Sequence, residues 1–154
     1  MTDDSSGMQG DAKPTVLIAD DNAQTRALLK RFFVKANERG DLDCQVIEAA
    51  DGDEAIQMLD IAQPELILCD IGMPVKDGFE VLHHFNEFSK RNNLFCFFAF
   101  LSASSEEKQR AFRSGAMGFL SKDDINYFIL TPLLRSWLRL AYLEREIAKH
   151  EAGG

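Results

Sequence analysis

The stretch Leu66-Ile67-Leu68-Cys69-Asp70-Ile71-Gly72-Met73-Pro74 is the most informative part of this chain about its fold. Its first four residues are apolar, and no polar residue alternates with them, which is typical of a strand covered on both faces. Such a strand belongs in a parallel sheet, where ligands bind beyond the carboxyl ends of the strands. Asp70 lies at that end, so it is either a turn or helix cap or a residue that does chemistry.

Length and composition are those of one ordinary globular domain. The chain has 154 residues, of which 45% are hydrophobic and 27% are charged. Its formal net charge of -8 argues against direct binding to nucleic acid, because the phosphate backbone requires clustered Lys and Arg.

No segment looks like a secretory signal or a membrane span. Residues 1–13 are acidic, polar and rich in Ser and Gly, and we predict a disordered tail there. The longest apolar run, Leu94 to Leu101, is shorter than the roughly 20 residues needed to cross a bilayer. The three cysteines, Cys44, Cys69 and Cys96, fall in predicted strands and are expected to be buried, reduced thiols. We therefore expect a cytoplasmic protein that does not enter the membrane.

Strand and helix patterns alternate five times along the chain. Short apolar runs predict the strands, and apolar residues at helical spacing predict the helices. The predicted strands are 15–19, 43–49, 66–70, 94–101 and 117–120, and the predicted helices are 23–36, 53–61, 79–90, 104–114 and 132–149. Ser104 and Glu107 fit a capping box for the fourth of these helices. The alternation predicts a parallel sheet wrapped on both sides by helices.

The last helix departs from a simple strand and helix unit. We predict a loop over residues 123–130, with Thr131 as the cap and Pro132 as the first residue of a helix that runs to about Lys149. Apolar residues seven apart lie on one side of this helix: Leu133, Leu140 and Ile147. We therefore predict that it meets another helix, and we expect a homodimer through this C-terminal helix.

Polar residues follow four of the five predicted strands. They are Asp20 and Asp21 after the first strand, Asp70 at the end of the third, Ser102 after the fourth and Lys122 after the fifth. Each alone is explained as a cap, a loop contact or a surface group. Because the carboxyl ends of parallel strands meet at one edge of the sheet, we expect three acids, a hydroxyl and an ammonium on one rim.

Three carboxylates this close repel one another. At an effective dielectric constant near 20 and a separation of about 4 Å, each pair costs about 4 kcal/mol, so such a cluster normally holds a cation. Oxygen ligands with few protein donors favour Mg²⁺. With the metal on one side and Lys122 on the other, the rim suits a phosphoryl group that a carboxylate oxygen attacks.

Four motifs, in the right order and on the right elements, resemble the receiver domain of two-component response regulators. They are the pair Asp20-Asp21, the run Asp70-Ile71-Gly72-Met73-Pro74-Val75-Lys76-Asp77-Gly78, the pair Ser102-Ala103 and the run Gly115 to Lys122. The resemblance implies a flavodoxin-like (βα)5 fold with strand order 2-1-3-4-5, here with an extended C-terminal helix. It covers about residues 15–143, so we predict residues 14–143 as the receiver domain and 144–154 as a helical extension or linker.

The resemblance also implies the chemistry of the rim. Asp70 would accept a phosphoryl group from a sensor histidine kinase or a phosphotransfer protein. Asp21 would bind Mg²⁺ directly and Asp20 through water. Asp70 and the backbone carbonyl of Gly72 would complete the protein ligands. Self-phosphorylation and autodephosphorylation would be the only reactions, so we do not expect an enzyme.

A switch is implied as well. Lys122 would pair with the acyl phosphate, and Ser102 would be the switch hydroxyl. Phe119 would change rotamer when Ser102 moves, although plain core packing explains this aromatic equally well. Phosphorylation would then bias the face formed by the fourth helix, the fifth strand and the fifth helix. One position departs from the family pattern, because Asp123 follows Lys122 where many members have proline, so we do not expect a cis peptide bond there.

Two other functions remain open at this point. A pseudo-receiver would use the same fold as a binding module without phosphate, and the intact set of rim residues counts against it. A Mg²⁺ phosphatase of the haloacid dehalogenase type would carry a second acid two residues after its aspartyl nucleophile. That position is Gly72 in this chain, which counts against the phosphatase.

Overall fold

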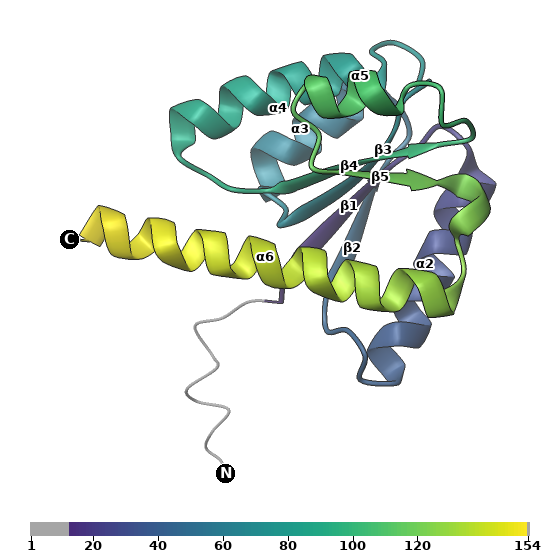
Figure 1. Cartoon of the computed structure of the whole chain (residues 1–154), viewed down its shortest axis with the longest axis horizontal. Coiled ribbons are helices and arrows are strands. Elements are labelled where there is room, and N and C mark those ends of the chain that lie inside the picture. The colour runs from purple at the N-terminus through teal and green to yellow at the C-terminus, as the bar shows by residue number, and fades with distance from the viewer. Residues whose placement is uncertain (1–12, 154) are drawn as a thin grey trace.

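The computed structural model, which describes residues 13–153, contains a five-stranded parallel sheet (Figure 1). The strands are β1 (Thr15–Ala19), β2 (Gln45–Ala49), β3 (Leu66–Asp70), β4 (Phe97–Ser102) and β5 (Gly118–Ser121). They pair in the order β2-β1-β3-β4-β5, and all four pairings are parallel. The predicted flavodoxin-like strand order is therefore confirmed. β3, the strand that ends in Asp70, lies at the centre of the sheet and is buried throughout.

Helices cover both faces of the sheet and form two apolar cores. They are α2 (Ala23–Glu38), α3 (Gly52–Ala62), α4 (Gly78–Asn92), α5 (Lys108–Arg113) and α6 (Tyr127–Gly153), with a short 3-10 helix η1 (Lys122–Asp124) before α6. One core joins α2 and α6 to the sheet, and the other joins α3, α4 and α5 to the opposite face. Each central strand therefore buries side chains on both faces, which explains its uninterrupted apolar run.

The predicted caps at helix starts are partly confirmed. Asn22 caps α2, because its side chain accepts hydrogen bonds from two amides of the first turn. The predicted capping box of Ser104 and Glu107 is wrong. The Ser104 hydroxyl accepts instead from the amide of Glu106, at 3.1 Å, and α5 begins at Lys108 with no side-chain cap. The capping box that the structure does show lies at α4, between Asp77 and Glu80.

The start of α6 also differs from the prediction. Residues 123–130 are not a loop, since η1 occupies part of them and α6 begins at Tyr127. Asn126 caps the helix, and its side chain accepts from the amide of Ile129 at 3.0 Å. Pro132 lies inside the helix, near its start, where it removes a single backbone hydrogen bond. The earlier start is favoured because it places Leu130 in the core, where it is fully buried.

Cys44, Cys69 and Cys96 are buried and free, as expected. The predicted acidic tail lies outside the described residues except for Lys13. Helix α6 runs without a break through residues 143 and 144 and extends past the sheet (Figure 1), and the domain boundary there stays a prediction. None of the helices within residues 13–153 combines the length and apolar character of a membrane span.

Candidate functional site

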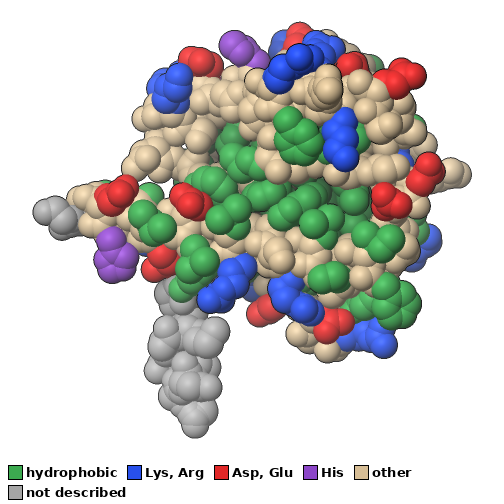
Figure 2. Space-filling view, viewed as in Figure 1, with side chains coloured by type: hydrophobic (Ala, Val, Ile, Leu, Met, Phe, Trp, Pro, Cys, Tyr) green, Lys and Arg blue, Asp and Glu red, His purple; other side chains and the backbone are tan. Residues whose placement is uncertain are grey.

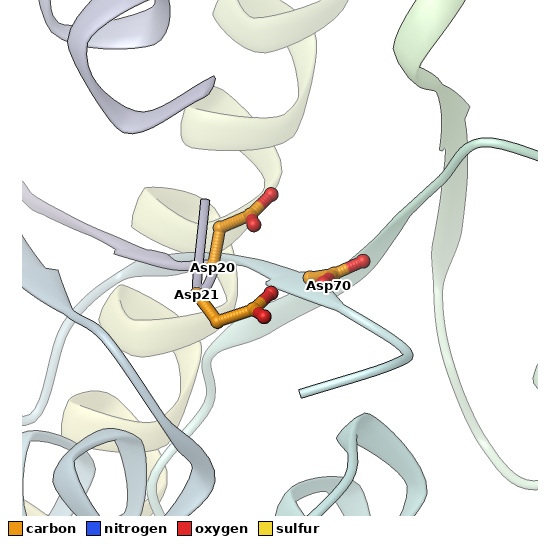
Figure 3. A group of neighbouring side chains, drawn as sticks. All are labelled: Asp20, Asp21 and Asp70. Carbon is orange, nitrogen blue, oxygen red and sulfur yellow. The ribbon is translucent and has the colours of Figure 1, made fainter. Parts of the chain in front are cut away.

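The carboxyl ends of the parallel strands bring the predicted rim residues together. Asp20 and Asp21 follow β1, and Asp70 ends β3, its neighbour in the sheet. One carboxylate oxygen from each of these three acids lies within 4.8 Å of the other two, and Figure 3 shows the three side chains side by side. Because β1 and β3 are adjacent and in register, the sheet geometry fixes this cluster without any loop having to fold over it. The predicted acid triad is therefore confirmed.

Lys122 completes the cluster from the end of β5. Its Nζ lies 2.9 Å from Oδ2 of Asp20 and 3.2 Å from Oδ1 of Asp70. The ammonium therefore bridges the two buried acids, while Asp21 remains exposed. One cation against three carboxylates leaves the site with an excess of negative charge.

Asp20 is the most constrained of the acids. It is fully buried, and its Oδ1 accepts a hydrogen bond from the amide of Asn22 at 2.8 Å. The guanidinium of Arg26 donates to the backbone carbonyl of Asp20 at 2.6 Å, which fixes the turn from β1 into α2. Apart from the ion pair with Lys122, Oδ2 of Asp20 has no hydrogen-bond partner among residues 13–153. A buried carboxylate oxygen left in this state has unused capacity for a ligand.

The electrostatics of the site shift two pKa values in ways that have distinct causes. Burial, together with the negative charge of Asp20, raises the pKa of Asp70, and the ammonium of Lys122 only partly opposes this. Burial alone would lower the pKa of Lys122, but the carboxylates of Asp20 and Asp70 outweigh it and raise this pKa. The raised pKa means that the ammonium form of Lys122 is favoured, while the acids around it repel one another.

The donor set fits a hard divalent cation. Carboxylate oxygens from Asp20, Asp21 and Asp70 are the ligands that Mg²⁺ prefers, and few protein ligands leave room for the waters it keeps. Gly72, whose backbone carbonyl was predicted as a further ligand, is exposed, and a side chain added there would meet no atom within 4 Å. The loop beside the cluster is thus open, and the ligand role of Gly72 stays a prediction.

The two predicted switch residues lie on the neighbouring strands. Ser102 is buried at the end of β4, where its hydroxyl donates to the carbonyl of Ser104 at 2.7 Å and accepts from the amide of Ser104 at 3.1 Å. Phe119 is half-buried on β5 and is paired in register with Phe100 of β4. Ser102 therefore lies at the rim, but its hydroxyl is engaged by its own loop rather than by the acid cluster, and Phe119 lies within β5 and packs against the core.

Sequence reasoning missed the residues that hold the loop after Asp70. Val75 adopts a left-handed conformation (φ 70°), and the amide of Lys76 donates to the carbonyl of Pro74 at 2.8 Å across it. Gly52, at the start of α3, lies against this turn so closely that a Cβ atom would come 2.0 Å from the carbonyl oxygen of Lys76. The pair Asp51-Gly52 indicated a turn in the sequence, but only the fold shows what Gly52 contacts.

Comparison with known proteins agrees with this geometry. The family model described as the response regulator receiver domain matches residues 16–128. The chemotaxis protein CheY of Halobacterium salinarum is 32% identical over 70% of this chain and 82% of its own length. Chemotaxis protein CheY4 of Vibrio cholerae superposes with a TM-score of 0.68 and 30% identity, covering 81% of this chain and 98% of that one.

A third similar structure contains a partner protein. It is the receiver domain of the response regulator Ssk1 of Saccharomyces cerevisiae, crystallised with the histidine phosphotransfer protein Ypd1. It superposes with a TM-score of 0.70 and 26% identity, covering 81% of this chain and 88% of that one. With the family model, the CheY relatives and the acid and lysine site in agreement, this chain belongs to the family of response regulator receiver domains.

Proposed function

We propose that this protein is a phosphoacceptor that receives a phosphoryl group on Asp70 and thereby switches a protein-interaction surface. The observation that carries the proposal is the ammonium of Lys122 held between two acids, 3.2 Å from the Asp70 carboxylate. A cation in that position neutralises charge that builds up on a transferring phosphoryl group. The carboxylate lies on the rim of the sheet, where a partner can reach it.

The proposed reaction needs one nucleophile and one donor. A carboxylate oxygen of Asp70 attacks the phosphorus of a phosphohistidine on the partner, and the bond between phosphorus and the histidine nitrogen breaks. The nitrogen keeps the electron pair, and Asp70 becomes an acyl phosphate. Lys122 then pairs with the phosphoryl oxygens. Hydrolysis of that acyl phosphate returns the carboxylate, and we propose no further enzymatic activity.

We propose Mg²⁺ as the cation of this site. Asp21 would hold it directly and Asp20 through water, and Asp70 with the carbonyl of Gly72 would supply the other protein ligands. The acid cluster supports this assignment, and so does Oδ2 of Asp20, which has no partner among residues 13–153 besides the Lys122 ammonium. A bound Mg²⁺ supplies charge neutralisation for the incoming phosphoryl oxygens, which Lys122 alone provides only in part.

The proposed partner is a sensor histidine kinase or a phosphotransfer protein in the cytoplasm. The similar receiver domain of Ssk1, crystallised with a histidine phosphotransfer protein, supports this class of partner. A phosphoryl group adds about -1.5 to -2 charges and strong acceptor oxygens. Ser102 would leave Ser104 to donate to these oxygens, Phe119 would follow, and the face formed by α5, β5 and α6 would change. The exposed apolar residues of α6 further support a homodimer through this helix.

The test is mass spectrometry after incubation with acetyl phosphate and Mg²⁺. We expect a single phosphate adduct on the wild type, none on Asp70→Asn, and an undiminished adduct on the control Asp123→Asn, which changes an exposed acid of η1. Omitting Mg²⁺ should suppress the adduct on the wild type. An adduct that persists on Asp70→Asn would contradict the assignment of Asp70. A wild type that takes up no phosphate would favour a pseudo-receiver that binds partners without phosphorylation.

A further inference from the structure

Helix α6 has two apolar sides, and only one of them is used within the chain. Its buried side packs on the sheet through Leu130, Leu134, Leu138 and Ala141. Its second side consists of Leu140, Leu143 and Ile147, which are 41%, 42% and 51% exposed. We call these three residues the outer stripe. At 3.6 residues per turn the centres of the two sides are roughly 130° apart, so the sheet cannot cover both. Figure 2 shows apolar side chains continuing along α6 toward its C-terminal end.

Arg145 fixes the part of α6 that carries the outer stripe. Its guanidinium donates to the carbonyls of Gln63, Pro64 and Phe95 at 3.0, 2.8 and 2.7 Å. It also pairs with the carboxylate of Glu65 at 2.9 Å. These partners belong to the two loops that precede β3 and β4, at the amino edge of the sheet. A planar guanidinium that is satisfied from several directions holds the helix in one orientation.

The middle of α6 is fixed as well. Trp137 stacks on Phe97 of β4 with ring centroids 4.8 Å apart, and its ring lies over Gly118 of β5, where a Cβ atom would come within 2.7 Å of it. The helix is therefore bound to the sheet both at Trp137 and about two turns later at Arg145. The outer stripe is thus presented by a rigid helix, and little conformational freedom remains to be lost when a partner binds it.

The outer stripe has the spacing of a coiled coil. Leu140 and Ile147 are seven residues apart, and Leu143 occupies the second apolar position of the heptad that Leu140 begins. Leu133, seven residues before Leu140, is partly buried against the core of its own chain. Arg139 and Glu144 flank this heptad on its two sides. Neither has an ion-pair partner among residues 13–153, whereas Glu146 is already paired with Lys149 at 3.0 Å. In a parallel pair of helices, Arg139 of one helix meets Glu144 of the other, and two-fold symmetry forms this ion pair twice.

We propose that α6 pairs in parallel with α6 of a second copy of this chain, with the outer stripe as its apolar seam and two Arg139 to Glu144 ion pairs at its edges. The proposal specifies the homodimer of the proposed function and does not depend on phosphoryl transfer to Asp70. The buried side of α6 points away from the seam, so the two sheets lie on opposite sides of the helix pair. The seam is only a few turns long, so we expect a small interface and a dissociation constant of the dimer in the micromolar range or above.

Exchanging the charges of Arg139 and Glu144 tests both whether the partner is a second copy of this chain and whether the two helices are parallel. Sedimentation velocity over a concentration series should give dimers for the wild type, and Arg139→Glu and Glu144→Arg should each weaken dimerisation by about ten-fold or more. An equimolar mixture of the two variants should recover dimers, because each variant then meets the opposite charge. The double variant should recover them too. A monomeric wild type at high micromolar concentration, or variants whose mixture and double form stay monomeric, would overturn the parallel dimer.

The role of Arg145 has its own measurement. Arg145→Met should speed amide hydrogen exchange over residues 143–151 by about ten-fold and weaken dimerisation, since the stripe loses its fixed orientation. Arg135→Met removes a more exposed arginine of the same helix and should leave both unchanged. An Arg145→Met variant that dimerises like the wild type would overturn the anchoring role. All of these variants keep the site residues, so failure of every one, wild type included, to accept phosphate from acetyl phosphate would count against the proposed function alone.

Discussion

At each edge of the sheet a cationic side chain lies among oxygen atoms, but the balance of charge differs. At the carboxyl edge, Lys122 faces the carboxylates of Asp20 and Asp70, with Asp21 beside them. At the amino edge, Arg145 faces three neutral carbonyls and the single carboxylate of Glu65. The first group has an excess of negative charge, and the second is neutral.

This difference in charge distinguishes a cluster that can bind a ligand, at the carboxyl edge, from a contact that only stabilises the fold, at the amino edge. The guanidinium of Arg145 and its partners are satisfied by one another, so nothing remains to attract a ligand. The carboxyl edge keeps a buried oxygen of Asp20 that is paired, among residues 13–153, with the Lys122 ammonium alone, and an acid, Asp21, that faces solvent. A bound cation would reduce the repulsion among these carboxylates, and uncompensated repulsion of this kind is typical of a functional site.

Of the variants considered, replacement of Lys122 at the carboxyl edge should lower the free energy of unfolding the most. Lys122→Met leaves the buried acids unpaired, and we expect a loss of about 3 kcal/mol in the free energy of unfolding in metal-free buffer. Addition of Mg²⁺ should return a large part of the loss, because a cation again neutralises the cluster. Urea denaturation with EDTA and with Mg²⁺ measures both values. If Mg²⁺ left the free energy of unfolding of both the wild type and Lys122→Met unchanged, the acid cluster would not bind the metal.

The matching change at the other edge is Arg145→Met. It removes four hydrogen bonds of a charged group that is partly exposed, and we expect a loss of about 2 kcal/mol. In contrast to Lys122→Met, this loss should be equal with EDTA and with Mg²⁺, because no part of the amino edge takes up a cation. A clear dependence on Mg²⁺ would mean that the two edges are coupled through the sheet.

Strain in the loop after Asp70 provides a smaller test on the carboxyl side. Val75 is β-branched and has a φ of 70°, a conformation that glycine adopts freely. Val75→Gly should stabilise the protein by about 1 kcal/mol after the larger chain entropy of glycine in the unfolded state is subtracted. Asn93→Gly is the control, because asparagine tolerates its φ of 49° and little change is expected. Thermal denaturation of both variants gives the comparison, and an unstable Val75→Gly would show that the turn is not strained.

Glu48 on the edge strand β2 should have the smallest effect. Its carboxylate pairs with Lys30 at 2.9 Å and with Arg26 at 3.0 Å, and hydrogen bonding from Lys30 is the main cause of its lowered pKa. A lowered pKa in the folded state means that the stabilisation is present above the pKa of the unfolded chain and is lost as the pH falls through the folded pKa. Because the pair is partly exposed, Glu48→Gln should cost about 0.5 kcal/mol at pH 7.

The pH dependence is the check on this last prediction. Urea denaturation of the wild type and Glu48→Gln over a pH series that descends from about pH 7 should show a difference that shrinks as the pH falls through the lowered pKa of Glu48. A difference that stays constant would assign the effect to packing of the side chain rather than to its charge.

The sequence predicted the strands and the rim residues because both follow from local patterns. A parallel strand that is covered on both faces must be apolar throughout, so β1, β3 and β4 were visible as uninterrupted runs. The acids and Lys122 follow those runs directly, and parallel pairing carries them to one edge. Cap residues predicted the starts of helices less reliably. Ser104 with Glu107, and Thr131 with Pro132, both resembled helix starts, but packing of the core placed the helix ends elsewhere.

Local patterns in the chain were therefore enough to specify the strands, their succession along the chain and the acids at the carboxyl edge of the sheet, since each depends on periodicity or on position at the end of a strand. The strand order 2-1-3-4-5 was predicted from the family resemblance. Packing in three dimensions was needed to establish the partners of Arg145 and the approach of Gly52 to Lys76. The contacts of Arg145 join residues about 50 to 82 positions apart in the chain. No local pattern encodes such contacts, because they arise from the packing of whole elements against one another.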